Sequence, residues 1–171
     1  MTEDNKKEEY KRKYLNRYIR ETNQSFVDYA QKSIFKQDEV GFIQNNAQLQ
    51  IAFLIGAFIQ VILKSAYGKY ESVTLKKWLS WQPFNKVNLL KLFTRTTSEM
   101  RRLDLNHPIA TELCREIENL KLKKSPSASN AKVEFCIYWG MDAYENFLTM
   151  LEESEAYKEF VKELNNKENK Q

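Results

Sequence analysis

The run Ile51-Ala-Phe-Leu-Ile-Gly-Ala-Phe-Ile-Gln-Val-Ile-Leu63 decides the fold, because a helix built from it is apolar on nearly every side. Such a helix belongs in the centre of a protein core. The run stops at Lys64, well short of the ~20 apolar residues that a membrane-spanning helix needs. Ala52 and Gly56, four positions apart, allow a second backbone to approach closely. We therefore predict a central core helix and no membrane partner.

The composition of the remaining chain favours helices over strands. Its 171 residues include only four Gly and three Pro, too few for the many tight turns of a sandwich or barrel. We predict an all-α, compact bundle of about six or seven helices. Residues 1–164 form one domain in this prediction, with residues 1–9 frayed and residues 165–171 a disordered tail. The charged N-terminus resembles no signal peptide, so we expect a cytoplasmic protein.

Apolar spacing and capping residues place the individual helices. Asp38 is the expected N-cap of the core helix, and His107 precedes Pro108, a residue favoured at the first position of a helix. The Ser-rich stretch 121–130 predicts a linker. The predicted helices cover residues 3–35 with a break at 22–25, 38–67, 72–82, 85 or 88 to 102, 108–120, 133–151 and 152–164.

Positive charge is concentrated directly after the core run. Between residues 64 and 102, nine Lys and Arg face only Glu71 and Glu99, so nine minus two gives +7, whereas the whole chain carries +4. A sustained imbalance of this kind is typical of proteins that bind nucleic acid. Without a readout motif, phosphate contacts are expected rather than base contacts. The candidate nucleic-acid-binding residues are Lys64, Lys69, Lys76, Lys77, Lys86, Lys91, Arg95, Arg101 and Arg102.

Signals of catalysis or cofactor binding are weak. The single histidine, His107, fits a helix cap better than a catalytic base, and no metal-ligand or phosphate-loop motif occurs. Cys114 and Cys136 lie in apolar-periodic segments, which predicts buried free thiols in a reducing compartment. On one helix His107 and Cys114 would lie roughly 10 Å apart along the axis, too far for a hydrogen bond. We predict no enzyme activity, no cofactor and no metal, with a hydrolase at this pair as a minor alternative.

The order of four motifs resembles a known family. The phrase Phe53-Leu-Ile-Gly-Ala57 opens the core run, and Lys77-Trp78-Leu79, Asn88-Leu-Leu-Lys-Leu-Phe93 and Phe135-Cys-Ile-Tyr-Trp-Gly140 follow. In this order they resemble the helical C-terminal region of the large subunit of type I-B CRISPR Cascade complexes. The resemblance covers residues 40 to 150, and type I-D small subunits are a close competitor. In such systems this region also exists as a separate small subunit.

The resemblance implies a non-catalytic role in an antiviral ribonucleoprotein complex. Small subunits contact the backbone and large subunits and further copies of themselves. They also support the guide RNA–target DNA duplex and the displaced strand. The nine basic residues named above would then contact phosphates, because opening DNA against a guide is a near-balanced exchange that such contacts can tip. An unrelated helical adaptor, binding a protein through the acidic segment that begins at residue 152, stays open as the alternative.

Overall fold

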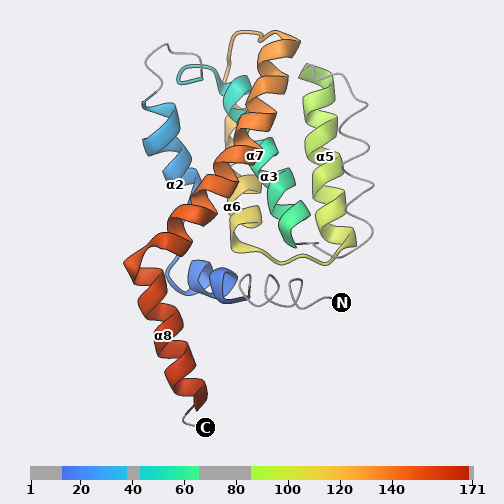
Figure 1. Cartoon of the computed structure of the whole chain (residues 1–171). Coiled ribbons are helices and arrows are strands. Elements are labelled where there is room, and N and C mark those ends of the chain that lie inside the picture. Colours follow the sequence, from blue (N-terminus) through green and yellow to red (C-terminus); the bar gives the residue numbers. More distant parts are fainter. Residues whose placement is uncertain (1–12, 38–42, 66–85, 170–171) are drawn as a thin grey trace. The chain divides into compact units, whose positions relative to one another are not determined.

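A computed structural model describes residues 13–37, 43–65 and 86–169, apart from the side chains of residues 86–88. The described ranges contain helices and no strand, which confirms the all-α prediction (Figure 1). The helix predicted at residues 72–82 lies outside the described residues. After a helical segment at residues 13–21, the elements are α2 (Phe26–Ala30), η1 (Gln31–Phe35), α3 (Ala47–Ser65), α5 (Lys86–Arg102), α6 (Pro108–Lys121), α7 (Asn130–Glu153) and α8 (Glu155–Asn169).

The chain divides into two compact units. The larger comprises Phe26–Glu145, and the smaller joins Met1–Ser25 to Asn146–Gln171. The single domain predicted over residues 1–164 spans both units and stays a prediction.

Helix α3 is the core of the larger unit, as the sequence predicted. It lies among α5, α6 and α7 (Figure 1), and every residue from Ile51 to Ile59 is buried. Its length and composition would allow a membrane span, but 72% of its apolar window is buried inside the protein. This burial is the pattern of a core helix, because the apolar side chains already contact other helices.

Two glycines allow α3 and α7 to cross in backbone contact. Gly56 on α3 faces the main chain of Ile137, and Gly140 on α7 faces the main chain of Phe53. The pairing is reciprocal, since each helix offers a glycine to the other. The spacing of Ala52 and Gly56 predicts this close approach but does not identify the helix that approaches.

Side chains fix where several helices begin. The Nδ1 atom of His107 accepts a hydrogen bond from the Ile109 backbone N–H at 3.1 Å, so the predicted cap of α6 is present. Helix α3 begins at Ala47, later than predicted, because Asn46 Oδ1 accepts from the Leu49 backbone N–H at 3.1 Å. Asp38, the predicted cap, lies outside the described residues. Asn46 is therefore the N-cap of the core helix.

Left-handed residues terminate two helices. Asn23 and Asp104 both have a φ of 52°. Beyond each, a backbone N–H returns to the last turn, from Gln24 to Ile19 and from Leu105 to Met100. This arrangement satisfies carbonyl groups that a helix end would otherwise leave without partners. The break predicted at residues 22–25 is thereby confirmed.

In the smaller unit, the first helical segment packs on α8 through aromatic rings. The Tyr18 ring lies 5.3 Å from the rings of both Tyr157 and Phe160 in edge-on geometry. Ser154 caps α8 by accepting from the Tyr157 backbone N–H at 3.2 Å. The helix extends to Asn169, beyond the predicted end at residue 164 and into the predicted disordered tail, although three of its last five residues are asparagine.

Candidate nucleic-acid interface

Helix α5 has a buried apolar face and an exposed cationic face. Leu89, Leu92 and Phe93 are buried. On the opposite side, at spacings of four, three and four residues, a single stripe consists of the exposed side chains Lys91, Arg95, Ser98 and Arg102.

The spacing of this stripe suits an extended polyanion. With a rise of about 1.5 Å per residue, Lys91 and Arg95 lie ~6 Å apart along the axis, and Arg102 lies ~10 Å further on. Leu90, Lys91, Thr94, Arg95 and Ser98 line a hollow of 450 Å³ on this face. A nucleic-acid strand along the stripe would meet two cations, then the hydroxyl group of Ser98, and then a third cation.

Negative charge hardly opposes this helix. Its sequence holds five Lys and Arg and one Glu, so five minus one gives +4. The one acid, Glu99, has a side chain only 13% exposed and forms an ion pair with Arg102. This pair orients the Arg102 guanidinium on the surface, and the remaining cations give the exposed face its positive potential.

The other predicted binding residues have different positions. Lys64, in the last turn of α3, forms an ion pair with Glu145 of α7 at 3.2 Å, and Gln60 also donates to that carboxylate. Lys64 therefore has a structural role already, and its phosphate contact stays a prediction. Arg101 is exposed at the end of α5. The residues Lys69, Lys76 and Lys77, together with the side chain of Lys86, lie outside the described residues.

One of the three lysines in the predicted linker, Lys121, lies next to α5. The Nζ atom of Lys121 lies 5.7 Å from the centre of the Phe93 ring, which ties the end of α6 to α5. Lys123 and Lys124 follow and are exposed. The Lys-Leu-Lys-Lys run at residues 121–124 was the available signal. The composition of this segment predicts only a linker, because the proximity of Lys121 to α5 depends on tertiary structure.

The residues considered for catalysis do not form a convincing site. His107 is buried, and its Nδ1 acceptor is occupied by the helix cap. Neither Cys114 nor Cys136 forms a disulfide, as predicted, but only Cys136 is buried and Cys114 is half-buried. Burial raises the pKa of the Cys114 thiol, with a further contribution from Glu118, whereas Arg101 lowers it. A raised pKa disfavours the thiolate, which is the nucleophilic form.

Metal-ligating residues are also dispersed in the described ranges, where no three His, Cys, Asp or Glu side chains gather.

Comparison with known proteins adds no assignment. No protein-family model, curated protein or solved structure matches the chain. The function of the chain is therefore inferred from the exposed residues of α5 and their neighbours.

Proposed function

We propose that this chain is a non-catalytic, nucleic-acid-supporting subunit of a ribonucleoprotein complex, acting through the exposed cationic face of α5. The observation that carries the proposal is the stripe Lys91, Arg95, Ser98 and Arg102 on a helix with a net charge of +4. The resemblance to the small subunit of type I-B or I-D-like CRISPR Cascade complexes supports the same role. Guide RNA and target DNA would then be the ligands, and backbone and large subunits the protein partners.

The chemistry of the stripe favours support over sequence recognition. Lysine and arginine contact phosphate oxygens, and the sequence has no motif for the recognition of base edges. Such contacts release counterions, so affinity falls steeply as salt rises. When a guide RNA displaces one strand of a DNA duplex, the RNA–DNA duplex that forms is about as stable as the DNA duplex that is lost. A few phosphate contacts can therefore shift the equilibrium toward the opened DNA.

The alternative role, a protein adaptor acting through the acidic C-terminal helix, has a weaker electrostatic basis. The predicted acidic segment, residues 152–164, holds five Glu and two Lys, so five minus two leaves a net charge of −3. Lys158 and Glu155 form one of the ion pairs on that surface, at 3.7 Å. Mixed charge of this kind is common on solvated helices, whereas the charge of α5 is nearly all of one sign.

The proposal is tested by binding of the full chain to a fluorescent oligothymidine of about 20 nucleotides and to a matching RNA–DNA duplex. Lys91→Glu combined with Arg95→Glu should abolish measurable binding at low salt. For the unchanged protein, three phosphate contacts on a single strand predict a ~20-fold loss of affinity between about 50 and about 200 mM salt.

The matched control is Lys32→Glu with Lys36→Glu, which changes the net charge equally at two other exposed positions. This control should retain most of the affinity and the salt slope. Equal losses of affinity in both double variants would mean that binding depends only on net charge, and the α5 interface would be rejected. Far-ultraviolet circular dichroism verifies that each variant keeps its helical content.

A further inference from the structure

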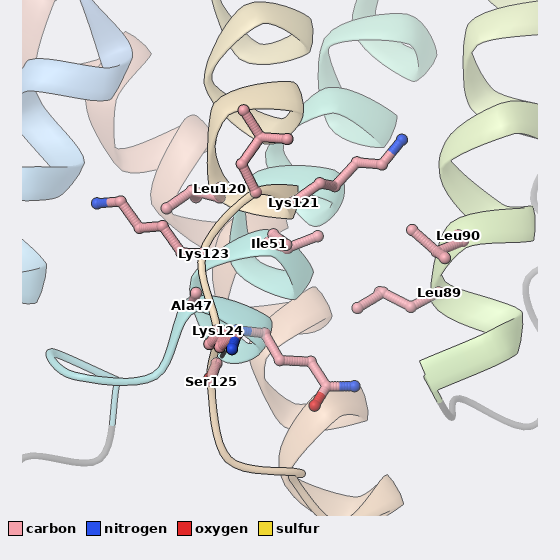
Figure 2. Close-up of a pocket in the computed structure, with 11 residues that line it drawn as sticks. Ala47, Ile51, Leu89, Leu90, Leu120, Lys121, Lys123, Lys124 and Ser125 are labelled. Carbon is pink, nitrogen blue, oxygen red and sulfur yellow. Dashed lines mark hydrogen bonds between the residues drawn. The ribbon is translucent and has the colours of Figure 1, made fainter.

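A groove in the larger unit combines an apolar floor with a basic edge. It has a volume of 530 Å³ and lies where the start of α3, the start of α5 and the end of α6 meet (Figure 2). The size is typical of cavities that hold a few apolar side chains. Its lining residues are Ala47, Gln48, Ile51, Leu89, Leu90, Leu120, Lys121, Leu122, Lys123, Lys124 and Ser125.

The apolar part of the groove contains two leucines that the fold leaves in contact with solvent. Leu90 is 44% exposed and Leu122 is 85% exposed, whereas Leu89 and Leu120 beneath them are buried. In Figure 2, Leu89 and Leu90 extend from α5 toward α3. Covering Leu90 and Leu122 would remove apolar surface from water, which is the usual driving force for association.

The charge of the edge defines the chemistry of a partner. Among the described residues, the lining includes three lysines and no carboxylate, and of these lysines Lys121 forms an ion pair, with Glu118 at 3.4 Å. Figure 2 shows that Lys121 extends toward α5, while the ammonium of Lys123 lies on the other side of the chain. Lys124 stands between them beside Ser125. A ligand in the groove therefore meets cations around an apolar floor.

The segment that carries these lysines is held in place by α3. Ser125 Oγ donates to Asn46 Oδ1 at 2.9 Å, and the Ala128 backbone N–H donates to Gln48 Oε1 at 3.2 Å. These bonds join the cap of α3 to residues far along the chain. They preorganise the basic edge, which lowers the entropic cost of binding a partner there.

We propose that this groove docks an acidic amphipathic peptide segment of a protein partner, with leucine-like side chains on the apolar floor and carboxylates against Lys121 and Lys124. Nucleic acid is the poorer occupant, because a sugar–phosphate chain has no aliphatic groups to cover Leu90 and Leu122. Docking of a short amphipathic helix in an apolar groove is a recurrent mode of peptide recognition. The inference goes beyond the proposed function and does not depend on it.

The test uses the full chain and a fluorescein-labelled synthetic peptide of about four helical turns, with leucines at alternating spacings of three and four and glutamates elsewhere. Fluorescence anisotropy should show saturable binding. The same peptide with serine in place of leucine, or lysine in place of glutamate, should bind at least tenfold more weakly. Equal binding of all three peptides, or of none, would overturn the proposal.

Variants of the groove localise the interaction. Leu90→Ser with Leu122→Ser should weaken peptide binding about tenfold, since exposed positions can change without loss of the core. Met150→Ser, at an apolar residue that is 46% exposed elsewhere, is the control and should bind normally. Lys121→Gln with Lys124→Gln should have a similar effect to the leucine pair. Unchanged affinity in both groove variants would contradict the assignment.

The oligothymidine assay separates this inference from the proposed function. Because Leu90 also lines the hollow on α5, the separating variant is Leu122→Ser alone. It should weaken peptide binding and leave oligonucleotide binding unchanged, whereas Lys91→Glu with Arg95→Glu should do the reverse. If Leu122→Ser weakens oligonucleotide binding instead, the groove belongs to the nucleic-acid surface and peptide docking is rejected. Circular dichroism and thermal unfolding of each variant verify that it is folded.

Discussion

A Cβ atom at Gly56 would lie 1.9 Å from the carbonyl oxygen of Ile137, so α3 and α7 touch main chain to main chain. Side chains cannot relieve this contact, because the atoms that meet are backbone atoms. At Gly140 a Cβ would lie 1.8 Å from the carbonyl oxygen of Phe53. The two glycines thus set the distance between α3 and α7, and through it the packing of the core of the larger unit.

Gly56→Ala and Gly140→Ala should each destabilise the protein. On helix propensity alone the change would add about 1 kcal/mol of stability, because glycine loses more conformational freedom on folding. The clash reverses the sign, and we expect a net loss of about 3 kcal/mol, as in an overpacked core. Urea unfolding followed by circular dichroism measures the difference.

The control for this pair is Ala131→Gly, at an exposed position of α7. It should cost no more than about 1 kcal/mol, which is the propensity difference alone. A Gly56→Ala protein as stable as the parent would mean that the helices do not touch at this point.

His107→Ala should lower stability by about 1–2 kcal/mol, because the first turn of α6 loses the acceptor for the Ile109 backbone N–H. His107→Asn supplies another capping acceptor and should recover most of the loss. Thermal unfolding of the three proteins makes the comparison. Equal losses in the Ala and Asn variants would assign the effect to packing of the buried ring and not to the cap.

Tyr144 should make the protein sensitive to alkaline pH. Burial raises the pKa of its hydroxyl well above the ordinary value of 10.0, and the neighbouring charge of Glu145 raises it further. Above pH 10.0 the unfolded chain therefore loses a proton that the folded chain keeps. Stability then falls as pH rises, by up to about 1.4 kcal/mol per pH unit.

Tyr144→Phe should remove this contribution, so its unfolding free energy should fall less between about pH 9 and about pH 11 than that of the parent. Tyr138→Phe, at a residue that is 50% exposed, should follow the parent. Urea titrations at the two pH values give the comparison. Parallel losses in all three proteins would exclude Tyr144 as the source.

Some features of the fold could be predicted because they depend on local patterns. An all-round apolar run indicates a core helix wherever it occurs, and a small residue within it indicates close approach. The His107-Pro108 pair combines a side chain that can cap a helix with a residue whose fixed φ suits its first turn. These inferences do not require knowledge of which helices are neighbours.

Other features depend on contacts between distant segments and could not be predicted. Asp38 and Asn46 are both acceptable caps by sequence, and the start of α3 at Ala47 involves Asn46, which also accepts from Ser125. The partner of Gly56 is set by the angle at which α7 crosses. The groove lysines lie in a segment of linker-like composition, whose position is fixed by hydrogen bonds to α3.

The end of α5 offers a way to separate charge from conformation. Asp104 has a φ of 52°, a left-handed conformation that glycine adopts without steric cost, and it lies two residues after Arg102. Asp104→Gly relieves the conformation and removes the negative charge. Asp104→Asn removes the charge alone. The two variants therefore differ in stability but share their electrostatic effect.

We expect both variants to bind oligothymidine about twofold more tightly than the parent at low salt, as a unit charge ~10 Å from a phosphate in water predicts. Only Asp104→Gly should also gain stability, by about 0.5 kcal/mol, because relief of left-handed strain exceeds the extra entropy that glycine loses on folding. The gain in affinity should disappear at high salt, where surface charges are screened. If Asp104→Asn leaves the affinity unchanged at low salt, the field at this end of α5 does not act on the ligand, and the interface must lie nearer Lys91.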